Sequence, residues 1–332
     1  MIANRVRLAA GLLVWLALAG FGAEAQDRLR FVMVTHGAAS DPFWAAIKRG
    51  ADRAAAESGV ELVTRVPETF DLEAMASLVN AAAAEKPAGL IVSIPNADAL
   101  ASAIKGAVSA GVPVISIASG FDVAASLGAL FHVGQSEYDA GRVAGSRMRE
   151  LGGTKALCLN HELGNVSLDL RCKGFIDGFR GSVEVLPVAS DPEAVREAVT
   201  ERLELDAEID AVLALSASTA GGPAVEAVRA LGDARTVRIA TFDTTEAILN
   251  AVADQEASFA IDQQPFLQGY LPVQYLVLLY REGVAPVGNV STGPKLVGAE
   301  EAARRLGRPA GAGTAESAVN PVEPSATEPS GG

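Results

Sequence analysis

Short apolar runs alternate with longer amphipathic segments along most of the chain. The runs are rich in β-branched residues and show no strict polar alternation, which is typical of strands that are covered on both faces. Between them lie segments of helical period, such as FWAAIKRGADRAAAESG and LEAMASLVNAAAAEK. Repetition of strand and helix produces right-handed parallel βαβ units, so the predicted fold class is α/β. The predicted strands are LRFVMVT, VELVTRV, AGLIVSI, VPVISIA, KALCLNH, VEVLPVA, AVLALS, VRIATFD and SFAIDQQ.

A long helix-poor break, ALFHVGQSEYDAG at residues 129–141, divides this alternation. Four strand–helix repeats precede the break, and a second series begins with KALCLNH, so we predict two similar doubly wound parallel-sheet domains with a crossover near Gln135-Ser136. After SFAIDQQ, the helical segment PFLQGYLPVQYLVLLYREG is apolar on two sides, which favours packing into the first domain. Pro272 inside this segment predicts a kink or an interruption of the helix.

Both ends of the chain differ from this pattern. Arg5, Arg7, an apolar run and the small-x-small site Ala23-Glu24-Ala25 predict a secretory signal peptide at residues 1–25. The alternative is an uncleaved membrane anchor, but the apolar run is shorter than the roughly 20 residues that a span needs. Residues 308–332 are rich in Pro, Gly, Ala, Ser and Glu, which predicts a disordered tail. About 280 residues remain for two domains of an exported, periplasmic protein.

Charge and cysteine content narrow the class of partner and the compartment. The formal net charge of −13 argues against nucleic acid as a partner, because a polyanion would be repelled. Cys158 lies on a predicted strand, and Cys172 lies on the helix expected to run back over that strand. Exported proteins permit disulfides, so we favour a bond between the two, with a pair of buried free thiols as the alternative.

Polar side chains follow most of the predicted strands. Open parallel sheets bind ligands beyond the carboxyl ends of their strands, so these residues are the candidates for a site. Hydroxyls, amides and carboxylates predominate among them, with one aromatic pair, and such a set suits a small polyhydroxylated molecule that hydrogen bonds to the polar groups and packs on the rings. The candidates are Thr35 to Trp44, Pro95-Asn96, Ser116 to Ser119, Asn165 to Asp169, Ser216 to Thr219, Asp243 and Gln263.

Several of these residues also have a purely structural interpretation. Asp41 is placed to cap the helix that begins at residue 42, and Asp243 could cap the helix that begins with TTEAIL. Phe43 and Trp44 diverge by about 100° on a helix, so we expect one ring to face the cleft and the other to enter the core. Gln263 could satisfy backbone groups at a domain crossover.

The sequence shows no catalytic, metal-binding or cofactor-binding motif. None of its three histidines, His36, His132 and His161, has a partner at a metal-binding helical spacing. His36 and His161 each end a predicted strand, where a structural role is favoured over a place in the cleft. No Gly-x-Ser-x-Gly elbow and no phosphate-binding GxxxxGK[ST] loop occurs, so we predict a binding protein without a cofactor rather than an enzyme.

The order of the motifs resembles the periplasmic sugar-binding proteins of the ribose/galactose-binding type, which serve ABC importers. The resemblance covers residues 28–300 in sequence order. It implies a first lobe of residues 27–135 plus 264–292, a second lobe of residues 136–263 plus 293–307, and a hinge of three crossover segments at QSE, DQQ and TGPK. The motifs that carry it are DPFWAAIKRGADRAAAESGVEL, PAGLIVSIPNADALASAIKGAVSAGVPVISI, HVGQSEYDAGRVAG, RCKGFIDGF, IDAVLAL, VRIATFD and FAIDQQPFLQGYLPV.

The resemblance also implies roles for individual residues. Some of the predicted ligand-binding residues occupy positions that bind hydroxyls or stack on sugar rings in the family. The others are polar residues at further strand ends, and Arg171 lies nearby in a less defined role. Ala118-Ser119 replaces the Asp-Arg pair of ribose-type members, which leaves a different sugar, a sugar alcohol, a cyclitol or a less hydroxylated metabolite as the cargo. The predicted ligand-binding set is Asp41, Phe43, Trp44, Asn96, Ser119, Asn165, Asp169, Ser216, Asp243 and Gln263.

The mechanism implied by the resemblance is hinge closure over the cargo. The closed form is favoured by the contacts that only it can make, and a monomeric, loaded protein then docks on an ABC permease in the inner membrane. A receptor that presents its ligand to a sensor kinase or chemoreceptor is the alternative, and a secreted hydrolase is the enzyme alternative. The predicted signal peptide and the absence of an N-terminal helix-turn-helix argue against a transcriptional repressor of the same core fold.

Overall fold

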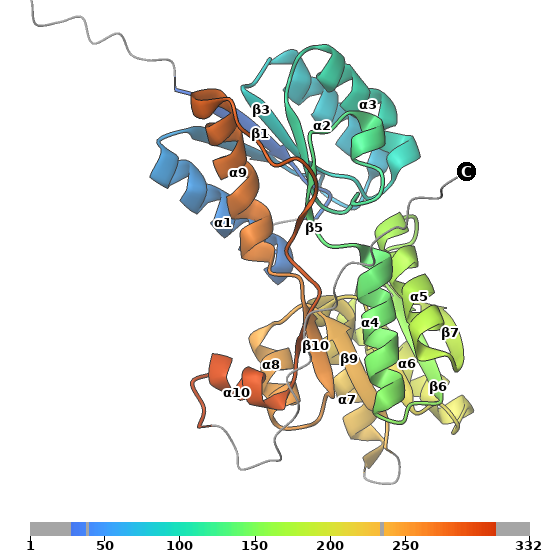
Figure 1. Cartoon of the computed structure of the whole chain (residues 1–332). Coiled ribbons are helices and arrows are strands. Elements are labelled where there is room, and N and C mark those ends of the chain that lie inside the picture. Colours follow the sequence, from blue (N-terminus) through green and yellow to red (C-terminus); the bar gives the residue numbers. More distant parts are fainter. Residues whose placement is uncertain (1–27, 38–39, 233–235, 310–332) are drawn as a thin grey trace, which may run out of the picture.

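The computed structural model describes residues 28–37, 40–232 and 236–309, and these form two α/β lobes (Figure 1). The predicted signal peptide and residues 310–332 of the predicted tail lie outside the described residues. Residue 308, the first of the predicted tail, is held by hydrogen bonds from its guanidinium to Asp254 and Asn250. None of the helices in the described part of the chain has the length and apolar character needed to cross a bilayer.

The first lobe is built on a six-stranded, entirely parallel sheet with the strand order β11-β5-β4-β3-β1-β2. Its central strands are buried along their whole length, as their uninterrupted apolar runs predict. The strands are β1 (Arg30–Val34), β2 (Glu61–Arg65), β3 (Gly89–Ser93), β4 (Val114–Ala118), β5 (His132–Gly134) and β11 (Val290–Ser291).

The second lobe repeats this arrangement with the strand order β12-β10-β9-β8-β6-β7. All neighbours pair in parallel except β12, which runs antiparallel to β10 with Leu296 opposite Ile261. The strands are β6 (Lys155–Asn160), β7 (Ser182–Pro187), β8 (Ala211–Ala214), β9 (Arg238–Phe242), β10 (Phe259–Asp262) and β12 (Lys295–Val297).

Helices cover both faces of each sheet, so each lobe has two hydrophobic cores (Figure 1). In the first lobe, α1 and α9 cover one face, and α2 and α3 cover the other. In the second lobe, α4 and α5 cover one face, and α6, α7, α8 and α10 cover the other. The helices are α1 (Pro42–Ser58), α2 (Leu72–Ala84), α3 (Ala97–Ser109), α4 (Glu137–Glu150), α5 (Val166–Phe179), α6 (Pro192–Leu205), α7 (Gly222–Ala230), α8 (Glu246–Ala253), α9 (Pro265–Glu282) and α10 (Ala299–Arg305), with a 3₁₀ turn at Ala125–Leu127 and a π-helical turn at Ala217–Gly221.

The chain passes between the lobes three times, after β5, after β10 and between β11 and β12. The two helices that follow the first two crossings pack closely on a helix of the lobe they enter, α4 on α5 and α9 on α1. Glycines permit this approach: a Cβ on Gly174 of α5 would lie 1.9 Å from the carbonyl oxygen of Tyr138 in α4. A buried polar network of Gln135, Gln263, Gln268 and Thr292 joins the crossing segments.

The structure differs from the sequence prediction at the crossings. The predicted helix-poor break at 129–141 contains β5, and α4 begins inside it at Glu137. Strands β5 and β11 have three and two residues, which is too short for an apolar run to be recognised. Helix α9 continues through Pro272, which is buried, so the proline does not interrupt it.

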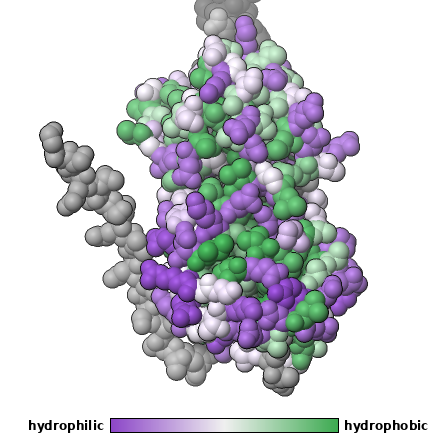
Figure 2. Space-filling model, turned by 90° about the vertical axis from the view of Figure 1, so that its right-hand side faces the viewer, coloured by the Kyte–Doolittle hydropathy of each residue, from purple (hydrophilic) through white to green (hydrophobic). Residues whose placement is uncertain are grey.

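The surface shows no separation of polar and apolar faces in the view of Figure 2. Hydrophilic residues are interspersed with hydrophobic ones over both lobes, and hydrophobic residues gather near the middle of this face (Figure 2).

Candidate functional site

A cavity of about 260 Å³ lies between the lobes, where the carboxyl ends of the strands in both sheets meet. This is the position that the α/β architecture predicts for a ligand. Eight of the ten predicted site residues line it: Asp41, Phe43, Trp44, Ser119, Asn165, Ser216, Asp243 and Gln263.

Asp41 caps α1, lines the cavity and contacts the second lobe. Its Oδ1 accepts hydrogen bonds from the backbone N–H groups of Phe43 and Trp44, at 2.9 and 3.3 Å, and so caps α1. Its Oδ2 accepts a hydrogen bond of 2.7 Å from the hydroxyl of Ser218, which belongs to the second lobe. Ser218 lies in the π-helical turn at Ala217–Gly221, a type of distortion that is frequent at functional sites. Asp41 therefore joins the two lobes directly.

An aromatic wall covers the first-lobe side of the cavity. Phe43 and Trp44 both line it and pack edge to face with ring centroids 5.1 Å apart, whereas the sequence predicted only one ring there. Both rings reach the cavity because the first turn of α1 points into it. His36 packs edge to face on Trp44 and on Phe70, at 4.7 and 5.8 Å. Its Nδ1 lies 2.8 Å from the hydroxyl of Ser93, and burial lowers its pKa to about 3, so the ring is neutral.

A buried ion pair closes the second-lobe side of the cavity. Arg171 in α5 donates from Nε and Nη2 to the carboxylate of Glu137 in α4, at 2.6 and 3.0 Å. It also donates to the carbonyl oxygen of Leu215 and to Oε1 of Gln263, and it lies 4.2 Å from the centre of the Phe242 ring. Both partners of the pair are buried, so the bidentate geometry offsets their desolvation.

Asp243 stands next to this pair with an unusual backbone and an unusual pKa. Its φ of 73° is left-handed, a conformation that non-glycine residues adopt at a cost of about 1–3 kcal/mol and that is common at binding sites. Gln263 donates a hydrogen bond of 2.6 Å to Oδ1 of Asp243. Burial raises the pKa of Asp243 to about 7. Thr245 rather than Asp243 caps the following helix, which leaves the Asp243 carboxylate available to the cavity.

Glu162, Asn165 and His161 complete the polar part of the wall. Asn165 caps α5 through Oδ1 and donates from Nδ2 to Glu162 at 2.6 Å. Burial raises the pKa of Glu162 and lowers that of His161 to about 4. The Nδ1 atom of His161 is buried and hydrogen bonds to nothing in the part of the chain that the structure describes.

Two predicted residues, Asn96 and Asp169, lie outside the residues that line the cavity. Asn96 caps α3 and donates from Nδ2 to the carbonyl oxygen of Gly164 in the other lobe, at 3.4 Å. Asp169 is exposed and accepts a hydrogen bond of 2.9 Å from Asn160. Asn96, at a helix cap after β3, and Asp169, in the first turns of α5, each hold neighbouring segments in place.

Several residues that line the cavity are absent from the set predicted from the sequence. The strand-end rule applies to β2 and β6 as well, and there it would have indicated Phe70 and Glu162. Arg171 is harder to recognise because it lies six residues beyond the cap of α5, on the helix face shared by Asn165 and Leu168. The three-residue spacing of Asn165, Leu168 and Arg171 along the helix was the signal that could have indicated it.

The arrangement is suited to binding hydroxyl groups. Carboxylates and amide oxygens accept from hydroxyls, a guanidinium and amide nitrogens donate to them, and rings pack on C–H faces. Among residues 28–37, 40–232 and 236–309, no group of three His, Cys, Asp or Glu side chains could hold a metal ion.

Residues 31–283 match the family model described as a periplasmic binding protein domain. The chain belongs to this family. The resemblance predicted from the sequence is thereby confirmed, and a curated member of similar sequence is the xylose/arabinose-binding protein XylF of Sulfolobus acidocaldarius. That protein is 24% identical over 69% of this chain, which spans about three-fifths (61%) of the relative's length.

Solved structures of periplasmic binding proteins confirm the two-lobed α/β fold. A carbohydrate transporter from Acidothermus cellulolyticus, solved with myo-inositol, is 35% identical with a TM-score of 0.79 and covers 83% of this chain and 96% of its own. A periplasmic sugar-binding protein of an ABC sugar transporter from Legionella pneumophila is 26% identical with a TM-score of 0.73, and the match covers 80% of this chain and 100% of that one. These are binding and transport proteins rather than enzymes, as predicted.

Proposed function

We propose that this periplasmic binding protein captures a neutral sugar or cyclic polyol in the cavity between its lobes and delivers it to an ABC permease. The proposal is carried by one observation: a cavity of about 260 Å³ with an aromatic wall on one lobe and a carboxylate, amide and guanidinium wall on the other. It is supported by the Acidothermus cellulolyticus protein, which was solved with myo-inositol. Myo-inositol is therefore the first probe, followed by xylose and arabinose.

The charges around the cavity favour a neutral guest. Asp41, Glu162 and Asp243 face it, and even with the raised pKa values of Glu162 and Asp243 these carboxyl groups supply negative charge, whereas the charge of Arg171 is compensated within the protein by Glu137. A sugar acid or sugar phosphate would place its negative charge against these carboxylates, where repulsion is weakly screened. We therefore expect glucuronate or inositol phosphate to bind much more weakly than the parent polyol.

Capture proceeds by hinge closure in this proposal. Outside the crossing segments, the described residues already link the lobes by hydrogen bonds from Ser218 to Asp41, from the backbone N–H of Val166 to Pro95, and from Asn96 to the Gly164 carbonyl. A guest that contacts both walls adds to these contacts only in the closed form, and so shifts the equilibrium toward closure. Closure in the periplasm would present both lobes to the permease.

Titration calorimetry with myo-inositol, xylose, arabinose, glucose and galactose tests the proposal. Trp44 provides a second signal, since the only other tryptophan, Trp15, belongs to the predicted signal peptide. We expect micromolar or tighter binding of at least one probe, a shift of Trp44 emission, and a melting temperature that rises with probe concentration. Small-angle scattering should show a smaller radius of gyration with the bound probe. If no neutral sugar or polyol binds, the proposed cargo class is wrong.

A further inference from the structure

The first two turns of α5 carry an unusual share of the binding site. Asn165, Leu168 and Arg171 all line the cavity from this one segment. The N–H of Val166, at the first helical position, donates to the carbonyl oxygen of Pro95 in the other lobe at 2.9 Å. Any shift of these two turns would therefore displace three wall residues and one contact between the lobes.

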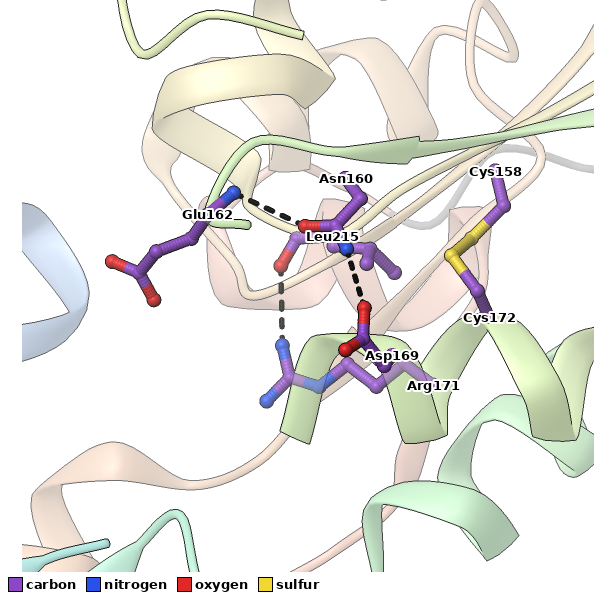
Figure 3. Close-up of a disulfide and its surroundings, with 7 residues drawn as sticks. All are labelled: Cys158, Asn160, Glu162, Asp169, Arg171, Cys172 and Leu215. Carbon is purple, nitrogen blue, oxygen red and sulfur yellow. Dashed lines mark hydrogen bonds between the residues drawn. A yellow bond between two sulfur atoms is a disulfide. The ribbon is translucent and has the colours of Figure 1, made fainter. Parts of the chain in front are cut away.

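Two links attach this segment of α5 to strand β6 of the same sheet (Figure 3). The Cys158–Cys172 disulfide joins the middle of β6 to the helix residue that directly follows Arg171. The hydrogen bond from Asn160 to Asp169 joins the end of β6 to the preceding turn, at 2.9 Å. Both cysteines are buried, and Figure 3 shows the Arg171 side chain extending from the helix away from the disulfide, past Asp169 and toward Leu215.

The hydrogen bonds of the Arg171 guanidinium depend on the position of α5 more than on the flexibility of the side chain. Its guanidinium contacts groups from three other segments: Glu137 of α4, the Leu215 carbonyl after β8, and Gln263 at the second crossing. These partners belong to separate elements, so the hydrogen bonds can all be made only when the backbone of α5 is correctly placed. A covalent bond at the adjacent residue fixes that placement.

We propose that the Cys158–Cys172 disulfide is a positioning element of the binding site, which holds α5 so that Arg171 and Asn165 face the guest. This inference rests on the proposed function. The affinity for the cargo then depends on whether the two cysteines are oxidised to a disulfide, although neither cysteine lines the cavity. A disulfide that acts only on global stability would leave the affinity of the folded protein unchanged.

The test compares Cys158→Ala/Cys172→Ala with a variant that loses stability elsewhere in the same sheet. Asp210→Ala is the matched control, because Asp210 accepts hydrogen bonds from Thr154 and Lys155 at the opposite end of β6. Calorimetry with myo-inositol, at a temperature where all variants are folded, should show roughly tenfold weaker binding for the cysteine variant and no change for Asp210→Ala. Equal affinity of the cysteine variant and the wild type would overturn the inference.

A double-mutant cycle tests whether the effect passes through Arg171. If the disulfide positions Arg171, Arg171→Lys should weaken binding much less in the cysteine-free background than in the wild type. Additive losses would show that the bond acts independently of Arg171, against the inference.

Hydrogen exchange separates a failure of this inference from a failure of the proposed cargo. Amides of Val166 to Arg171 should exchange faster in Cys158→Ala/Cys172→Ala than in Asp210→Ala, whether or not any probe binds. Equal exchange would refute the positioning of α5 even if myo-inositol binds, whereas absence of binding to every probe with faster exchange would refute only the cargo class.

Discussion

Replacement of Asp243 by asparagine should stabilise the protein while impairing its binding site. Burial raises the pKa of this carboxyl, with smaller opposing effects from the Arg171 charge and the Gln263 hydrogen bond, and with Asp41 and Glu137 adding repulsion. Asparagine has the same shape, tolerates the left-handed backbone at φ 73° and can still accept the hydrogen bond from Gln263. The substitution therefore removes the charge and little else.

The size and sign of the effect follow from linkage. An aspartate has a pKa of 3.8 when unperturbed and about 7 in this fold. Between these values the folded state retains a proton that the unfolded state loses, so the stability of the wild type falls as pH rises and levels off above about pH 7. The full difference corresponds to about 4 kcal/mol, and more than half of it develops between pH 5 and 8. Because the carboxylate borders the cavity, we expect about 2 kcal/mol over that range.

Urea unfolding and calorimetry of both proteins at pH 5, 6.5 and 8 provide the assay. Asp243→Asn should be more stable than the wild type at pH 8, and the gap should narrow toward pH 5. Its affinity for myo-inositol should be at least roughly tenfold lower at pH 8, because a charged acceptor is lost. A stability difference that does not vary with pH would show that the pKa of Asp243 is ordinary, and the reasoning would fail.

Three further substitutions, one of them with a matched control, test the contacts between elements. Ser218→Ala should weaken polyol binding by about 0.5–1.5 kcal/mol, mainly through faster dissociation, since its bond to Asp41 exists only when the lobes meet; an unchanged dissociation rate in stopped-flow fluorescence would contradict this. Gly174→Ala should destabilise by about 2 kcal/mol or more because its Cβ would meet a backbone oxygen at 1.9 Å, whereas Gly106→Ala, with open space around it, should stabilise by about 0.5–1 kcal/mol in the same unfolding assay. Glu137→Gln should cost about 3–5 kcal/mol by leaving the buried guanidinium without its counter-charge, and a loss below about 1 kcal/mol would argue against that burial.

The fold class could be predicted from the sequence because its strands are buried on both faces. Continuous apolar runs such as those of β3 and β4 have a single interpretation when helical segments separate them. The crossings are different, since β5 and β11 are held by pairing with an existing sheet edge rather than by a pattern of their own. Such short strands are defined by tertiary contacts and leave little signal in the sequence.

The site could be predicted where one geometric rule applied and not where contacts depend on packing. Asp243 and Gln263 follow strands, so their placement at the cavity follows from the architecture. Arg171 reaches the cavity from two turns within a helix, and its orientation depends on Glu137, a residue 34 positions away. No local pattern encodes that pairing, whereas a buried Arg–Glu pair is evident once α4 and α5 are seen to touch.

In the proposed function, the two walls of the cavity contact different parts of the guest, one wall from each lobe. Strands β4 and β9 occupy equivalent positions in the two sheets, and each is followed or ended by a residue with left-handed backbone, Ala118 at 57° and Asp243 at 73°. Both lobes thus place a left-handed residue at this strand end, but one supplies a methyl group and the other a carboxylate. We therefore expect the second lobe to provide most of the directional hydrogen bonds to a bound polyol and the first lobe to provide mostly ring surface. If recognition is divided in this way, specificity depends on how rigidly the second wall is held, and that is the role we propose for the disulfide beside Arg171.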